Sequence, residues 1–130
     1  MVNQLKLMNP QAFISIFGNI PSFIGSELLD VQIKRDGPTL VIRLMTNEVV
    51  QSKPKRWDKW DVIYVELSFF AIRDLTITGV STKNQINEFE IKEREKEAEL
   101  EIGCDSQMKI KFLFDWARVE QITPGLIGTP

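Results

Sequence analysis

The chain has 130 residues, of which 43% are hydrophobic, 26% charged and 9% aromatic. This length fits a single domain over residues 1–130 with its own core, and the composition excludes a disordered or collagen-like protein. The sequence has no histidine and one cysteine, Cys104, which argues against histidine-dependent hydrolases, most zinc sites and disulfide-stapled secreted domains. Its formal net charge of -2 gives no overall field that would select nucleic acid or an anionic membrane as partner.

The N-terminal segment predicts no targeting signal. Residues 1–9 carry one lysine and no apolar stretch of signal-peptide length, and no window of the chain reaches the ~18 apolar residues that a membrane span needs. We therefore expect a cytoplasmic protein.

A short helix is the first predicted element. Asn9 can cap its first amide groups, Pro10 fits the first helical position, and Gly18 can take the left-handed conformation that ends a helix. The helix has a broad apolar face that must be buried against something larger, formed by Phe13, Ile14, Ile16 and Phe17.

The next segments alternate apolar and polar residues with the period of two that is typical of half-buried strands. The first strand has an apolar face of Leu29, Val31 and Ile33. A turn at residues 36–38 leads to its hairpin partner over residues 39–46. After a polar loop over residues 47–60, a long strand begins at Asp61, and residues 71–74 predict a bend or bulge before the alternation continues to Gly79.

Residues 86–122 predict consecutive antiparallel strands, each with one wet face. The hairpin that closes over residues 103–107 is predicted in a register that pairs apolar residues, namely Ile102 with Met108, Leu100 with Ile110 and Ala98 with Phe112. The same register pairs opposite charges, namely Glu101 with Lys109 and Glu99 with Lys111.

The predicted fold class is α+β and mostly β. We expect one N-terminal helix packed on a curved antiparallel sheet of about seven strands, arranged as a partial barrel or a meander. The last short strand spans residues 117–123, and residues 124–130 are expected to form a frayed tail.

Short segments along nearly the whole chain carry a family resemblance. They are Ile16-Phe17-Gly18, Pro21-Ser22-Phe23, Glu27-Leu28, the run from Leu67 to Gly79, Asn84-Gln85-Ile86, and the segment from Phe114 to Pro124. In this order they resemble the immunity protein 50 family, small bacterial proteins thought to neutralise a cognate toxin in polymorphic toxin systems. In that family a His-Asp pair usually follows the phenylalanine that corresponds to Phe23, where this chain has Ile24-Gly25. The resemblance implies a protein that binds a toxin domain.

Charge is distributed unevenly along the chain. Residues 86–101 contain seven glutamates against three basic residues, a local net charge of -4. If these segments are strands, one wet face carries four of the glutamates, namely Glu88, Glu90, Glu99 and Glu101. One interpretation is a solvated face that also prevents edge pairing. The other is an acidic surface that steers a basic toxin domain into contact and mainly raises its association rate.

The loop over residues 47–60 mixes aromatic and basic side chains, namely Lys53, Lys55, Arg56, Trp57, Lys59 and Trp60. Such a mixture can bind single-stranded nucleic acid through stacking and phosphate contacts. We favour the alternative that one or both indoles cover the sheet, because the chain as a whole is not basic. Trp and Arg are also frequent anchors of protein interfaces, which makes Trp57, Trp60 and Arg56 candidate toxin contacts.

No group of residues predicts a catalytic site. Asp58 and Asp61 lie in a loop, and Glu99 and Glu101 lie on a predicted exposed face, where carboxylate pKa values shift little. The sequence has no phosphate-binding glycine motif, and nothing basic flanks Cys104 in sequence. We therefore predict no catalytic residue, no metal and no cofactor.

The predicted function is that of a non-enzymatic immunity protein whose partner is a toxin domain, with no nucleic acid and no membrane as partner. The alternative is a small-ligand carrier, because a curved antiparallel sheet closed by a helix can enclose an apolar cavity.

Overall fold

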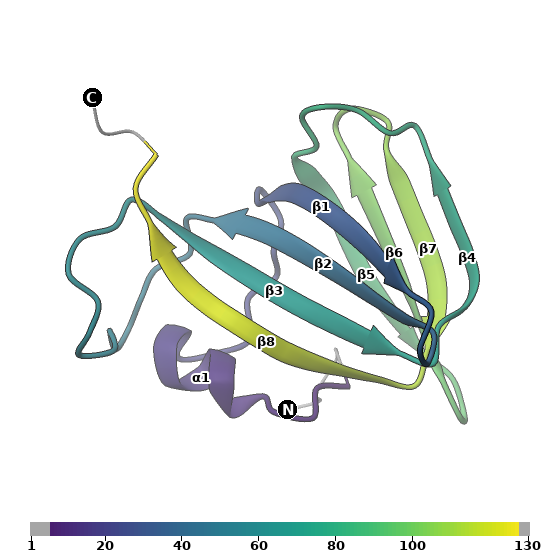
Figure 1. The fold of residues 1–130 in the computed structure, drawn as a ribbon, viewed down its shortest axis with the longest axis horizontal. Helices are drawn as coiled ribbons and strands as arrows, with labels where there is room; N and C mark the ends of the chain where they lie inside the picture. Colours follow the sequence, from purple (N-terminus) through teal and green to yellow (C-terminus); the bar gives the residue numbers. More distant parts are fainter. Residues whose placement is uncertain (1–5, 128–130) are drawn as a thin grey trace.

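Residues 6–127, the part of the chain that this computed structural model describes, form one helix followed by eight strands in two antiparallel sheets (Figure 1). The elements in chain order are α1 (Gln11–Phe17), β1 (Glu27–Lys34), β2 (Thr39–Thr46), β3 (Val62–Phe70), β4 (Arg73–Thr78), β5 (Ile86–Glu93), β6 (Ala98–Cys104), β7 (Lys109–Phe114) and β8 (Trp116–Gly125). The predicted class of an N-terminal helix with mostly antiparallel strands is confirmed, and the strands are divided between two open sheets of four.

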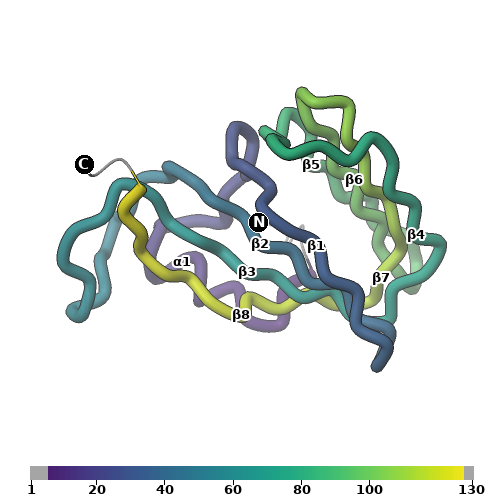
Figure 2. The backbone as a smooth tube through the Cα atoms, turned by 45° about the horizontal axis from the view of Figure 1, so that its top comes forward, coloured from purple at the N-terminus to yellow at the C-terminus, as the bar shows by residue number. Residues whose placement is uncertain are grey.

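Two connections carry the chain between the sheets. Sheet A has the strand order β1-β2-β3-β8, and sheet B has the order β4-β7-β6-β5. The chain leaves sheet A after Phe70 and returns to it at Trp116. The N–H of Asp115 donates to the carbonyl of Phe70 at 3.0 Å. The two connections therefore lie side by side at one corner, from which the sheets diverge (Figure 2).

The bend predicted over residues 71–74 forms this corner. Ala71 and Asp74 have positive φ angles of 59° and 53°, a conformation that reverses the local twist of a strand and is uncommon for residues other than glycine. Arg73 braces the corner, because its Nη2 lies 2.9 Å from Glu97 Oε1 and 3.0 Å from Asp115 Oδ1. The bend thus directs β4 into a second sheet instead of extending the first.

The hydrophobic core lies between the inner faces of the two sheets and continues beneath α1. Phe69 of sheet A packs edge to face against Phe112 and Phe114 of sheet B, with ring centroids 5.2 and 5.0 Å apart. Phe13 of α1 packs on Phe23, whose ring centroid is 5.6 Å away, and Phe23 in turn packs on Phe89 of β5 at 5.3 Å. Phe89 is partly buried and the other five side chains are almost completely buried, so one core joins the helix and both sheets.

Helix α1 ends as predicted but begins differently. Gly18 has a φ of 83° and its N–H donates to the carbonyl of Ile14. The predicted cap by Asn9 is wrong, because the Asn9 side chain is engaged elsewhere. Asn9 Nδ2 donates to the carbonyl of Val119, and Asn9 Oδ1 accepts from the Val119 N–H, both at 2.9 Å. Asn9 therefore ties the segment before α1 to the edge strand β8.

The first hairpin forms as predicted, but a bulge changes which side chains of β1 face inward. The pairing of β1 with β2 shifts between Leu28 and Asp30. As a result Leu28 is buried, whereas Leu29 and Ile33 are 38% and 55% exposed and Val31 is half-buried. The predicted apolar face of β1 therefore lies mostly at the exposed edge of sheet A.

The predicted register of the β6–β7 hairpin is wrong by two residues. The structure pairs Ile102 with Ile110, Leu100 with Phe112 and Ala98 with Phe114. A three-residue loop over 105–107 sets this register, because such loops close on a left-handed residue, here Gln107 with a φ of 81°. Glu101 consequently lies opposite Lys111 and not Lys109. A slip of two residues leaves every side chain on its predicted face, so the alternation of the sequence does not reveal it.

Strand β8 is longer than predicted. Pro124 pairs with Ile63 and Gly125 pairs with Val62, so neither residue belongs to a frayed tail. A Cβ on Gly125 would lie 2.3 Å from Cε2 of Tyr64, so a larger residue at this position would require the Tyr64 ring to move. The end of the predicted tail, residues 128–130, lies outside the described residues, as do residues 1–5.

Candidate partner-binding surfaces

The outer face of sheet B carries the four predicted glutamates. The pairing of β5 with β6 sets Glu90 directly opposite Glu101, Glu88 opposite Gly103 and Lys92 opposite Glu99. Two lysines of the next strand, β7, share this face, because Lys109 lies opposite Gly103 and Lys111 opposite Glu101. The strands thus bring together carboxylates that are far apart in the sequence.

Three of these carboxylates lack a close cation. Glu90 is exposed, and Glu88 and Glu101 are half-buried. Within residues 6–127 no lysine or arginine nitrogen lies within 4 Å of any of the three, whereas Glu99 has two such neighbours. Like charges placed directly opposite each other destabilise a sheet by some tenths of a kcal/mol. We therefore expect the Glu90–Glu101 pair to cost stability, and Lys111, which lies opposite Glu101 on β7, to offset part of this cost. We call Glu88, Glu90 and Glu101 the acidic face.

The exposure predicted for Glu99 is wrong. Its side chain retains only 10% of its accessible surface, because it lies beneath two longer basic side chains. Arg94 Nη2 is 3.6 Å from Glu99 Oε1, and Lys111 Nζ is 3.6 Å from Glu99 Oε2. The predicted proximity of Glu99 to Lys111 is present, although the two residues are not directly opposite each other.

The loop between β2 and β3 separates its aromatic from its basic side chains. Trp57 is buried, with 2% of its surface accessible, and packs edge to face on the partly buried Trp60 at 5.4 Å. Lys53 Nζ donates to the carbonyl of Trp57. A buried indole cannot stack on a nucleic-acid base, and Trp57 instead covers the core, as the favoured interpretation predicts. The loop cations, such as Arg56, are exposed. The loop itself lies at the end of the molecule opposite sheet B (Figure 1).

Comparison with known families assigns the chain to one family. The family model of immunity protein 50, Imm50, matches residues 9–125. The chain belongs to this family. No curated protein and no solved structure matches the chain.

Asn84, which lies in one of the segments that resemble the Imm50 family, has a structural role that the hydrophobic pattern does not predict. Asn84 is buried, and its side chain donates to the carbonyl of Ser81 at 2.8 Å and accepts from the Ser106 hydroxyl at 2.7 Å. Its backbone carbonyl accepts from Leu28 at 2.9 Å, and its N–H donates to Glu27. Asn84 thus joins the start of β1, the β4–β5 loop and the β6–β7 turn. Burial of this polar side chain cannot be seen in the hydrophobic pattern.

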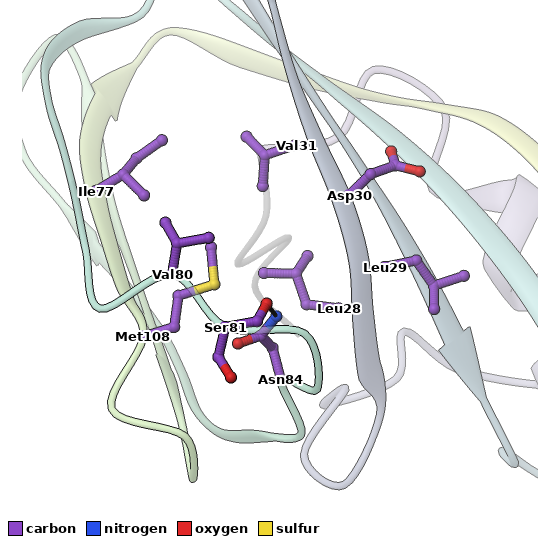
Figure 3. A pocket seen from close by; sticks show the side chains of 9 residues that line it. All are labelled: Leu28, Leu29, Asp30, Val31, Ile77, Val80, Ser81, Asn84 and Met108. Carbon is purple, nitrogen blue, oxygen red and sulfur yellow. Dashed lines mark hydrogen bonds between the residues drawn. The ribbon is translucent and has the colours of Figure 1, made fainter.

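The two sheets of this Imm50 protein leave a small pocket at their open side, between β1 and β4. It measures about 240 Å³, and Figure 3 shows Leu28, Val31, Ile77, Val80 and Met108 converging on it. Pockets that enclose small ligands usually measure about 300–1,000 Å³. The size of this pocket therefore gives little support to the predicted alternative of a small-ligand carrier.

The thiol of Cys104, the one cysteine of the chain, is not activated for nucleophilic chemistry. Cys104 is buried at the end of β6, and desolvation, with the carboxylates of Asp105 and Glu27 nearby, raises the pKa of its thiol from 9.0 to about 11. The thiol is therefore protonated at neutral pH and is a poor nucleophile. Within residues 6–127 no group of three or more His, Cys, Asp or Glu side chains could hold a metal ion, and no helix is long and apolar enough to cross a membrane.

Proposed function

We propose that this Imm50 protein is a non-enzymatic immunity protein that binds a cognate bacterial toxin domain and neutralises it by occupying its surface. Membership of the family over residues 9–125 supports the class of function. The observation that carries the proposal is the Glu90–Glu101 pair, two carboxylates held opposite each other without a cation within 4 Å in the described part of the chain. A pair that costs stability is retained most readily where a partner supplies the missing positive charge.

The toxin surface that fits this face is basic. Charged patches of opposite sign steer two proteins toward each other, so the acidic face of Glu88, Glu90 and Glu101 acts mainly on the association rate. Glu99 lies on the same side of sheet B, beneath Arg94 and Lys111. Trp60 and Arg56 of the β2–β3 loop remain candidates for a second contact, whereas the buried Trp57 serves to hold that loop in place.

The proposal is tested by co-expression with the toxin domain encoded next to the gene. We expect the Imm50 protein to restore growth, and the purified toxin domain to form a stable complex with it. If growth is not restored and no complex is detectable, the proposed function is wrong.

The docking face is tested by charge reversal. Glu88→Lys combined with Glu101→Lys should slow association with the toxin domain and weaken its dependence on salt, because both effects depend on the acidic face. Asp30→Lys combined with Asp36→Lys makes the same change of net charge on β1 and the turn that follows it, where both residues are exposed. The control should keep most of the association rate, and equal rates for the two double variants would exclude sheet B as the contact.

A further inference from the structure

We infer that Glu99 forms the base of a binding site for a guanidinium group, the side chain of an arginine on the toxin surface. This inference rests on the proposed function, since it names the group by which the partner is anchored. Its site is a hollow of about 340 Å³ on the outer side of sheet B. The residues that line the hollow include Asp74, Thr76, Arg94, Glu99, Lys111 and Leu113.

The first argument is the unused hydrogen-bonding capacity of Glu99. Nine tenths of its side chain is buried, yet within residues 6–127 it accepts no hydrogen bond. Its two basic neighbours remain 3.6 Å from its oxygens, beyond the 2.7–3.2 Å of an N–H···O bond. Among the described residues, the fully buried side-chain polar atoms without a hydrogen bond are Ser26 Oγ and Trp57 Nε1, so the oxygens of Glu99 still reach the solvent that fills the hollow. Both oxygens of Glu99 therefore favour a ligand that supplies N–H donors at close range.

The second argument is the position of Asp74 and Leu113. Asp74 lines the same hollow and has no ion-pair partner in the described part of the chain, so it provides a second carboxylate for an entering cation. Leu113 gives the hollow an apolar side chain, against which the methylene stem of an arginine can pack. The planar guanidinium fork matches two carboxylate oxygens better than an ammonium does.

The two cations already present do not close the site. The side chains of Arg94 and Lys111 are 54% and 53% exposed, and their distances of 3.6 Å to Glu99 are too long for direct hydrogen bonds. Either side chain can swing outward when a guanidinium donates directly to Glu99. An anionic ligand would bridge Arg94 and Lys111 but would then lie beside two carboxylates. The most deeply buried charge of the hollow is negative, and this favours a cation.

The site can be tested without the toxin, by titrating the full chain with argininamide, which carries a guanidinium group and no carboxylate. We expect saturable NMR shifts of the amides of Thr76, Glu99 and Leu113. Glu99→Gln should weaken binding by about tenfold or more, the usual contribution of a charge-assisted hydrogen bond. Glu95→Gln, the same change of charge in the exposed β5–β6 turn, should leave the affinity unchanged. Arg94→Gln should strengthen binding, because it removes a competing cation.

Three results would overturn the inference: shifts that do not saturate, an equal affinity of Glu99→Gln and the original chain, or weaker binding by Arg94→Gln, which would indicate an anion site. If Glu99→Gln does not fold, judged by the dispersion of its amide spectrum, Asp74→Asn at the exposed part of the hollow replaces it and should also weaken binding. Because no toxin is present in this assay, its failure is distinct from a failure of the co-expression test.

Discussion

Glu90→Lys should have opposite effects on stability and on toxin binding. Glu90 lies directly opposite Glu101 on the exposed face of sheet B. The substitution removes a repulsion and places an ammonium group opposite Glu101. Cross-strand charge pairs contribute roughly 0.2–1 kcal/mol each, so replacing repulsion by attraction should raise the free energy of unfolding by about 0.5–1 kcal/mol at low salt.

This gain is measurable by urea denaturation. With a slope of about 1.5 kcal/mol per molar urea, typical of a small domain, the midpoint should rise by roughly 0.3–0.7 M. The gain should shrink at about 1 M salt, where charges are screened over ~3 Å. Glu95→Lys makes the same change of charge in the exposed β5–β6 turn, outside the paired strands, and should move the midpoint much less.

The same Glu90→Lys protein should associate more slowly with the toxin domain, because the acidic face that attracts it is weakened. A midpoint that does not rise would show that Glu90 and Glu101 do not repel each other as their pairing implies. A raised midpoint together with an unchanged association rate would show that the acidic face is only a solvated surface and not the docking site.

Three further substitutions test the fold. Asn84→Ala should lower the free energy of unfolding by about 1–3 kcal/mol, because two side-chain hydrogen bonds are lost. If urea denaturation shows a decrease below about 0.5 kcal/mol, Asn84 does not hold the three segments together. Gly79→Ala should lower the melting temperature far more than Gly25→Ala. Both glycines have a positive φ, but only at Gly79 would a Cβ lie 2.5 Å from the carbonyl oxygen of Gln107. Equal losses of melting temperature in the two variants would refute the clash. Because burial raises the pKa of Cys104 to about 11 in the folded chain, stability should fall as pH rises from about 9 toward 11. The difference in stability from Cys104→Ala should be constant below the pKa of an unfolded thiol, about 8.5, and should change above it. A difference that does not change with pH between about 8 and 11 would refute the shift.

The sequence predicts those parts of the fold in which local pattern and burial agree. Residues 39–46 form a strand with the predicted bounds, and its apolar side chains Leu40, Ile42 and Leu44 are fully buried. The separation into two sheets is not visible in the same way, because it depends on the left-handed conformations of Ala71 and Asp74. Glycine in a sequence indicates that a left-handed conformation is possible, whereas alanine and aspartate give no such indication.

The candidate surfaces were predictable only in part. Alternation places Glu90 and Glu101 on one wet face, and the structure places them there. Alternation cannot tell how far the long side chains of neighbouring strands cover a carboxylate, and for this reason the burial of Glu99 beneath Arg94 and Lys111 was not foreseen. The bulge at Leu28 depends on how β1 pairs with β2, and no residue near Leu28 indicates it in the sequence.

The side-by-side connections at residues 71–72 and 115 determine how sheet B could be replaced during evolution. Strands β3 and β8 pair with each other along their length. The segment that forms sheet B is therefore inserted between two paired strands, and its two ends lie next to each other. Segments whose two ends lie close together can be replaced with little effect on the strands that flank them, provided that their core contacts are matched. A replacement for sheet B would therefore have to keep two sets of contacts. These are the aromatic packing of Phe112 and Phe114 on Phe69 and the hydrogen bond from the Ile86 N–H to the carbonyl of Ser26.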